Sequence, residues 1–340
     1  MKAYTPGSAF DWTGRIDSET DFDAFRWHQW VETMDIGEDD LEPLEKGIGF
    51  ALIGFCSDEG VSRNKGRQGA SNGPDSIRRE LRNKPCPFTQ AVKLVDMGNI
   101  HCVDGRLEEA QNRLSDLVSS VVAKGWFPLV LGGGHEVAFG NYNGVAKGIQ
   151  SLEPGKTLVD LGIINFDAHF DLRPVPGQST SGTMFRQIAD QCADQDQPFS
   201  YFCIGIQENA NTVALFKTAK ELGVEYILAK EMANRDDWSI AEKLDLFIRN
   251  HDHLYVTICA DVIASAFAPG VSAAQPLGIM PEQLLKWLKH ILLSGKTLSF
   301  DIAEVSPRFD HDHTTANLAA VVVFAVVRTL AQANGYGVSY

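Results

Sequence analysis

The sequence predicts a three-layer α/β/α fold, in which helices cover both faces of a central, mostly parallel sheet of about eight strands. Short apolar segments alternate along the chain with helical patterns, and Gly, Pro or Asn frames each apolar segment. Strands that are buried on both faces read as continuous apolar runs, so this alternation is typical of a parallel sheet. The chain has no internal repeat and no low-complexity segment.

The predicted strands follow one another at intervals that leave room for a helix between most neighbours. They are the segments 49–55, 92–97, 127–131, 161–166, 201–206, 224–228, 254–259 and 297–302. The predicted helices include 76–81, 106–123, 210–222, 240–249, 281–293 and 315–333. No linker-like stretch divides the chain, so we expect one domain over 46–340, preceded by a polar N-terminal extension over 1–45.

Composition and charge argue against several classes of protein. With 44% hydrophobic and 22% charged residues among 340, the chain has the profile of a globular protein. The formal net charge of −14 disfavours binding to nucleic acid or to acidic membranes. The longest apolar stretch, 318–327, is shorter than the ~20 residues of a membrane span, and the N-terminus lacks a signal-peptide pattern. Six cysteines without a C-x-x-C pair favour a reducing cytoplasm.

The strongest chemical signal directly follows the predicted strand 161–166 and reads N-F-D-A-H-F-D-L-R. Asp167, His169 and Asp171 are spaced by two residues, so they can point the same way where the strand ends. Two carboxylates and an imidazole at the carboxyl end of a strand are typical of a metal site in an α/β sheet. The alternative is a polar loop whose Asp residues cap a helix.

Two further motifs follow other predicted strands. The first is V-L-G-G-G-H-E at 130–136, whose three glycines allow a sharp turn before His135. Beside the motif after strand 161–166 we expect His135 to be a metal ligand, whereas alone it would be interpreted as a packing histidine. T-I-C-A-D-V-I at 257–263 places Asp261 at a strand end, with Cys259 two residues earlier. A mixed set of oxygen and nitrogen ligands fits a pair of Mn²⁺ ions, which activate water, so the pattern predicts a hydrolase.

A fourth motif, F-D-I-A-E-V-S-P at 300–307, places Glu304 just past another predicted strand. Both oxygens of a carboxylate can accept hydrogen bonds from an amidine or a guanidine group. We therefore expect Glu304 to bind a cationic nitrogen group of the substrate. The alternative is an ordinary solvated glutamate.

At these residues the chain resembles the ureohydrolase superfamily, which includes arginase, agmatinase and formimidoylglutamase. Its motifs are G-G-x-H, D-A-H-x-D, and D-x-D before a turn rich in Pro, Gly and Thr. Here they read G-G-H at 133–135, D-A-H-F-D at 167–171, and C-A-D at 259–261 before F-A-P-G at 267–270. G-A-S-N-G-P-D-S-I-R at 69–78 and the motif around Glu304 are similar to further family motifs, and the resemblance spans about 49–329.

Three stretches are most similar to the formimidoylglutamase branch, whose members hydrolyse N-formimidoyl-L-glutamate to L-glutamate and formamide in histidine degradation. They are R-N-K-G-R at 63–67, D-A-H-F-D-L-R at 167–173, and S-G-T-M-F at 181–185. The substrate-binding residues that the resemblance implies are Asn64, Arg67, Arg173, Ser181 and Glu304. A guanidinium at Arg173 suits a substrate with two carboxylates. Its alternative is a structural salt bridge.

The resemblance also implies roles in a binuclear manganese site. The implied metal ligands are His135, Asp167, His169, Asp171 and Asp261. The chain departs from the pattern at Cys259, where the family usually has a bridging Asp, and either a thiolate ligand or a buried cysteine fits this position. In the implied mechanism a metal-activated hydroxide attacks the formimidoyl carbon, and Asp171 carries its proton to the departing nitrogen.

Three other functions compete with this interpretation. The first is a ureohydrolase that acts on a guanidine, such as an agmatinase, an arginase or a guanidinobutyrase. The second is a binuclear metallophosphatase, although its motifs come in another order and its G-N-H motif is missing here. The third is a metal-deficient, non-catalytic ligand-binding relative. As for partners, we expect a small-molecule substrate and a homo-oligomer, as relatives often assemble into one.

Overall fold

A computed structural model describes residues 2–175, 177–234 and 237–338. Its strands are β1 (Tyr4–Thr5), β2 (Glu32–Thr33), β3 (Ile48–Cys56), β4 (Val92–His101), β5 (Phe127–Leu131), β6 (Leu161–Phe166), β7 (Ser200–Ile206), β8 (Glu225–Leu228), β9 (His253–Cys259) and β10 (Thr297–Ala303). They form one sheet in the order β1-β4-β3-β5-β10-β9-β6-β7-β8, and β2 also pairs with β4. Among the described strands only β1 and β4 pair in antiparallel fashion.

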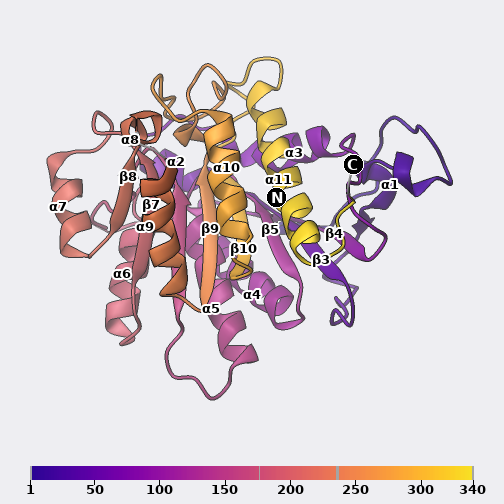
Figure 1. Cartoon of the computed structure of the whole chain (residues 1–340), viewed down its shortest axis with the longest axis horizontal. Coiled ribbons are helices and arrows are strands. Elements are labelled where there is room, and N and C mark those ends of the chain that lie inside the picture. Colours follow the sequence, from indigo (N-terminus) through magenta and orange to yellow (C-terminus); the bar gives the residue numbers. More distant parts are fainter. Residues whose placement is uncertain (1, 176, 235–236, 339–340) are drawn as a thin grey trace.

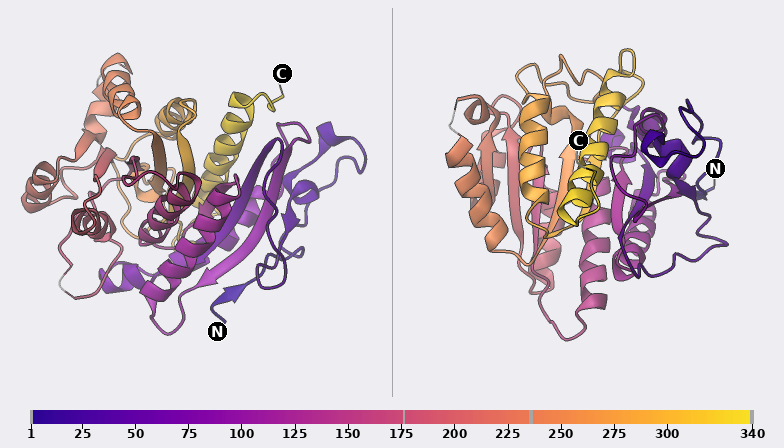
Figure 2. Two further views of the ribbon diagram at one scale, coloured as in Figure 1. Left: turned by 90° about the horizontal axis from the view of Figure 1, so that it is seen from below. Right: turned by 45° about the vertical axis from the view of Figure 1, so that its right-hand side comes forward.

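Helices lie on both sides of this sheet, as Figures 1 and 2 show. They are α1 (Trp27–Trp30), α2 (Glu59–Arg63), α3 (Gly73–Leu81), α4 (Leu107–Ala123), α5 (Val137–Leu152), α6 (Met184–Asp194), α7 (Val213–Glu221), α8 (Ala229–Asn234), α9 (Asp237–Arg249), α10 (Pro281–Leu292) and α11 (Thr314–Ala333). Short 3₁₀ turns occur at η1 (Phe22–Ala24), η2 (Ala70–Asn72) and η3 (Ala260–Val262). The predicted α/β/α fold is confirmed.

Two apolar clusters, one on each face of the sheet, hold the layers together. Side chains alternate along a strand, so Phe50 and Leu52 of β3 enter one cluster while Ala51 and Ile53 enter the other. Helices α3, α9, α10 and α11 contribute to the first cluster, and α4, α5, α6 and α7 to the second. Both faces are therefore covered, which explains why the strands read as unbroken apolar runs.

The eight predicted strands correspond to β3 through β10, and the six predicted helices to α3, α4, α7, α9, α10 and α11. Helix α5 was not predicted, because glycines at 140, 144 and 148 lower its helix propensity. A Cβ on these glycines would lie 2.8 Å from the Gln111 carbonyl oxygen, 2.6 Å from Val118 Cβ and 2.7 Å from Val122 Cβ, respectively. The glycines therefore let α4 and α5 approach closely.

The first 45 residues add two short strands to the edge of the sheet. Strands β1 and β2 both pair with β4, and they were not predicted because each has only two residues. Beside them the Trp12 indole donates to Asp96 at 2.8 Å, and the buried Arg78 guanidinium forms an ion pair with Asp96 at 2.7 Å. The boundary of the domain at residue 45 stays a prediction.

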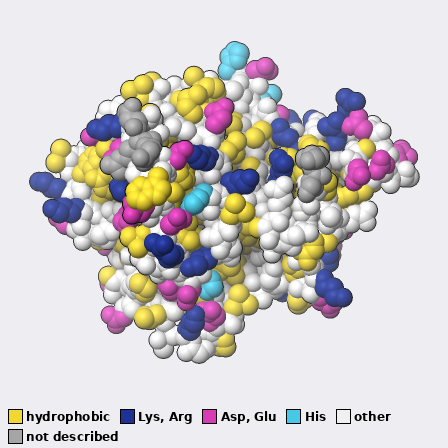
Figure 3. Space-filling model, viewed as in Figure 1, with side chains coloured by type: hydrophobic (Ala, Val, Ile, Leu, Met, Phe, Trp, Pro, Cys, Tyr) yellow, Lys and Arg dark blue, Asp and Glu magenta, His cyan; other side chains and the backbone are white. Residues whose placement is uncertain are grey.

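Helix α11 is the described helix with the length and apolarity of a membrane span. However, 61% of its most apolar window is buried inside the protein, as in the core helix of a globular fold. Its first turn is capped by Asp310, which accepts from the backbone N–H groups of Thr315 at 2.9 Å and Ala316 at 3.0 Å. On the face shown in Figure 3, Lys and Arg side chains are interspersed with Asp and Glu side chains.

Candidate active site

The predicted site residues meet at the carboxyl ends of β5, β10, β9 and β6, which are neighbours in that order. His135 follows β5, Glu304 follows β10, Cys259 ends β9, and Asp167 follows β6. Parallel strands bring their carboxyl ends to one edge of the sheet, so residues far apart in the chain become neighbours.

Asp167 lies between two histidines and faces each with a different oxygen. Its Oδ2 lies 3.0 Å from Nδ1 of His135, and its Oδ1 lies 3.4 Å from Nδ1 of His169. The Asp167 side chain is fully buried, and the next described helix begins only at Met184, so Asp167 does not cap a helix as in the alternative considered above. A carboxylate in this position can join two adjacent metal sites.

Two overlapping groups of ligand atoms surround this carboxylate. One comprises His135, Asp167 and Cys259, and the other comprises Asp167, His169 and Asp261, with ligand atoms within 4.8 Å of one another in each group. Asp261 Oδ2 lies 3.2 Å from Nδ1 of His169, whereas its buried Oδ1 has no hydrogen-bond partner among the described residues. Buried carboxylates with an unpaired oxygen fit divalent cations as ligands. The residues present therefore fit a pair of such ions.

Asp171 joins the same cluster from the loop after β6. Its Oδ2 lies 3.1 Å from Nδ1 of His135, and its backbone adopts a left-handed φ of 50° that is uncommon for a residue other than glycine. Burial, together with the charge of Asp167, raises the pKa of Asp171 to about 6. Burial also raises the pKa of Asp167, but hydrogen bonds with His135 and His169 outweigh this effect and lower it below its usual range.

A buried hydrogen-bond chain that was not predicted from the sequence orients His135. The Thr257 hydroxyl donates to Asp301 at 2.5 Å, so its oxygen is left to accept from Nε2 of His135 at 3.0 Å. Asp301 also accepts from the Tyr255 hydroxyl, and from the Asn141 amide at 2.7 Å. A proton on Nε2 leaves Nδ1 free as the ligand atom that faces the site.

Glu304 is held with one oxygen engaged and one free. Its Oε1 accepts from the backbone N–H of His135 at 3.2 Å, while its buried Oε2 has no partner among the described residues. It also has a left-handed backbone, with a φ of 65°, and burial raises its pKa well above the usual range. At 5% exposure it is not an ordinary solvated glutamate.

A cavity of about 250 Å³ lies over this cluster. It is lined by Asn64, Lys65, Gly66, Arg67, His135, His169, Asp171, Arg173, Ser181, Cys259, Asp261, Ser272, Ala273 and Glu304. All five residues predicted to bind the substrate are therefore brought to one cavity. Within the described parts of the chain, the Arg173 side chain has no ion-pair partner, so the alternative of a structural salt bridge is not observed.

Residues 48–328 match the arginase family. The chain belongs to the arginase family. It is 52% identical over 335 residues to a formimidoylglutamase of Clostridium tetani, covering 98% of each chain. Its fold is similar to that of formimidoylglutamase from Bacillus subtilis, with a TM-score of 0.75 at 24% identity, over 94% of this chain and 97% of the other. A formiminoglutamase of Trypanosoma cruzi with Mn²⁺ matches with a TM-score of 0.72 at 25% identity, over 84% and 94%.

Cys259 and Phe185 of this arginase-family chain border the cluster of predicted metal ligands. Cys259 replaces the expected Asp, and its thiol is buried with a pKa raised well above the usual range, by burial and then by the charge of Asp167. Phe185 lies beside the predicted metal ligand His135. Its ring centroid is 4.4 Å from that of Tyr201, on which it stacks, and 5.7 Å from that of His135, which it contacts edge-on, so it forms an apolar wall next to the His135 imidazole.

Proposed function

We propose that this arginase-family protein hydrolyses N-formimidoyl-L-glutamate to L-glutamate and formamide. Oxygen from water joins the formimidoyl carbon, the bond from this carbon to the glutamate nitrogen breaks, and that nitrogen takes up a proton. The observation that carries the proposal is a cavity whose buried floor is acidic and whose exposed rim holds Arg173, a cation without an ion-pair partner among the described residues. The relative named formimidoylglutamase at 52% identity supports the same activity.

We infer that two Mn²⁺ ions are the cofactor. The residues that would hold them are His135, Asp167, His169, Asp171 and Asp261, with Cys259 as a further candidate. When bound, such ions lower the pKa of water and stabilise negative charge that develops on the attacked carbon group. Asp167, which faces both histidines, is the residue best placed to serve both ions.

The chain itself binds and orients the substrate and moves the proton. Glu304 presents its free Oε2 to the N–H groups of the amidine, which places the carbon near the cluster. Asp171 lines the same cavity, and we assign it the proton taken from water and returned to the leaving nitrogen. Asn64, Ser181, Arg67 and Arg173 also line the cavity, and we assign them to the glutamate half.

The test is to load the purified protein with Mn²⁺ and assay formamide and glutamate from N-formimidoyl-L-glutamate. Urea release from arginine, agmatine and 4-guanidinobutyrate is measured in parallel. We expect formamide and glutamate in equal amounts and no urea. Asp171→Asn should abolish turnover while the far-ultraviolet circular dichroism is unchanged. Urea release would instead indicate a guanidine substrate, and inactivity with two ions bound would indicate a non-catalytic relative.

We also propose that the protein is a cytoplasmic homo-oligomer that binds neither nucleic acid nor membranes. The net charge of −14 and the burial of α11 support the part of this proposal that concerns nucleic acid and membranes. We further propose that residues 46–340 form one domain and that residues 1–45 are an extension of it, since the strands of the extension pair with β4 of that domain.

A further inference from the structure

Two segments that border the cavity carry four cationic side chains: Arg63, Lys65, Arg67 and Arg173. These side chains differ in how many hydrogen-bond and ion-pair partners they already have within the protein. Arg63 is nearly buried and its guanidinium is fully engaged. It donates to Glu59 at 3.0 Å, to Glu108 at 2.7 Å and to the Gly105 carbonyl at 2.7 Å. The Arg63 guanidinium therefore stabilises the fold and is not available to bind a ligand.

Arg67 is also largely engaged. Its Nε donates to the Ser272 carbonyl at 2.9 Å and its Nη2 to the Val271 carbonyl at 2.7 Å, and the guanidinium lies 4.3 Å from the centre of the Phe309 ring. These contacts fix the segment that contains Arg67 against the loop after β9. Among the described residues they leave only Nη1 of this guanidinium without a partner, so Arg67 offers a substrate carboxylate one nitrogen instead of a bidentate pair.

Lys65 and Arg173 have no such partners. Both line the cavity and both are exposed, and neither side chain has a hydrogen bond or an ion pair anywhere in residues 2–175, 177–234 or 237–338. Asn64 accompanies Arg173, because a Cβ added to Gly182 would lie 3.0 Å from Arg173 Cδ and 3.1 Å from Asn64 Nδ2. Two unpaired cations thus border the exposed part of a cavity whose buried part is acidic.

The backbone at Lys65 is held in a defined turn. Its φ is 61°, in the left-handed region, and the N–H of Lys65 donates to the Ser62 carbonyl at 2.9 Å. The next residue, Gly66, is packed so closely that a Cβ would lie 2.8 Å from both Ser272 Oγ and Val61 Cγ1. Arg67 anchors the other side of the turn. Lys65 is therefore presented on a rigid support, which reduces the entropy lost on binding.

We propose that Lys65 is a specificity-determining residue that binds one carboxylate of the substrate, while Arg173 and Asn64 bind the other. This inference rests on the proposed function, because it assumes a substrate with an amidine at one end and two carboxylates. A cavity that is acidic at its floor and cationic at its rim matches that distribution of charge. It also accounts for an unpaired lysine at a strained backbone position.

The experiment pairs each variant with substrates that lack one carboxylate. Lys65→Met removes the charge, and Lys65→Asn removes it with a residue that tolerates the left-handed backbone. Lys217→Met, at an exposed lysine on α7 without a described partner, is the matched control. Rates are measured on N-formimidoyl-L-glutamate, on N-formimidoyl-L-glutamine, which lacks the γ-carboxylate, and on N-formimidoyl-4-aminobutyrate, which lacks the α-carboxylate.

We expect both Lys65 variants to lose about 10- to 100-fold in kcat/KM on the full substrate, mainly through KM. The loss should disappear on the one analogue that lacks the carboxylate bound by Lys65, and Arg173→Met should show the opposite selectivity. An equal loss on all three substrates, or none on any, would overturn the assignment of Lys65. The wild-type protein reports separately on the proposed function, which fails if no formamide is released from the full substrate.

Discussion

The hydroxyl of Thr257 donates to the carboxylate of Asp301 at 2.5 Å, across the pairing of β9 with β10, where the two residues are direct partners in register. The donation determines which way the hydroxyl points, so its oxygen can only accept from Nε2 of His135. The orientation of the His135 imidazole is thus determined by two side chains of the sheet itself, Thr257 and Asp301, neither of which lines the cavity.

Loss of the Thr257 hydroxyl should weaken metal binding without unfolding the protein. Thr257→Val has nearly the same shape but cannot accept from His135, so the imidazole is no longer held with Nδ1 toward the site. We expect Mn²⁺ affinity to fall by about 10- to 100-fold, measured by competition with a chelator. Thr257→Ser keeps the hydroxyl and should bind close to the wild-type level. Equal affinity in Thr257→Val and wild type would contradict the role of this hydrogen bond.

Removal of Asp167 should affect both ions, whereas removal of Asp261 should affect one. Asp167 belongs to both groups of ligand atoms, and Asp261 to one of them. We expect Asp167→Ala to bind almost no Mn²⁺ and Asp261→Ala to retain about one ion per subunit, measured by elemental analysis after dialysis. Asp116→Ala, at a 75% exposed carboxylate on α4, is the control and should keep both ions. The same metal content in both site variants would argue against a shared Asp167.

The buried ion pair between Arg78 and Asp96 should be necessary for stability. The side chains are 3% and 1% exposed, and the Trp12 indole donates to the same carboxylate. Asp96→Ala leaves a buried guanidinium with only the half-exposed Asp75 carboxylate, 3.7 Å away, as counter-charge, so we expect the free energy of unfolding to fall by about 3 kcal/mol in urea titrations. Asp40→Ala, which breaks an exposed ion pair with Lys124, should change stability little. A similar small effect for both variants would show that the buried pair is dispensable.

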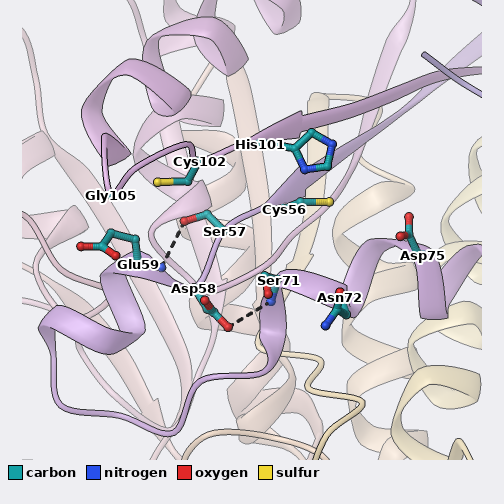
Figure 4. Close-up of a pocket in the computed structure, with 10 residues that line it drawn as sticks. All are labelled: Cys56, Ser57, Asp58, Glu59, Ser71, Asn72, Asp75, His101, Cys102 and Gly105. Atoms are coloured by element: carbon teal, nitrogen blue, oxygen red, sulfur yellow. Dashed lines mark hydrogen bonds between the residues drawn. The ribbon is translucent and has the colours of Figure 1, made fainter. Parts of the chain in front are cut away.

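Cys56 should react slowly with alkylating reagents near neutral pH. It lines a separate cavity of about 420 Å³, shown in Figure 4, so small reagents can reach it. Burial raises the pKa of the Cys56 thiol to about 12 from an ordinary value of 9.0, so the proton stays on sulfur. The thiolate fraction of Cys56 at pH 8 is therefore about 1,000-fold lower than that of an ordinary cysteine. The rate with iodoacetamide, followed by mass spectrometry, should rise tenfold per pH unit from pH 7 to 9.5. A plateau near pH 9 would contradict this pKa, and the urea-unfolded chain provides the reference for an ordinary thiol.

The layers of the fold could be predicted from the sequence because they depend on local patterns. Apolar runs such as the one that became β6 are long enough, and sufficiently framed by turn residues, to identify buried strands without knowledge of their neighbours. Strands β1 and β2 and helix α5 could not be identified in this way. A strand of two residues is too short to show a periodic pattern. The glycines of α5 are favourable only because α4 packs against them.

The sequence by itself also determined which residue types gather at the site, because ligand-type side chains at a spacing of two after an apolar run can face the same way at the carboxyl end of a strand. Only the tertiary structure decided which side-chain atoms at the site lie close to one another or form hydrogen bonds. It placed Asp167 between two histidines and linked Thr257 to Asp301. It also left Lys65 and Arg173 without partners among the described residues, whereas Arg63 and Arg67 are hydrogen-bonded. The physical reason is that hydrogen bonds and charges are satisfied between segments distant in the chain, so their partners depend on the order of strands in the sheet, which local patterns do not specify.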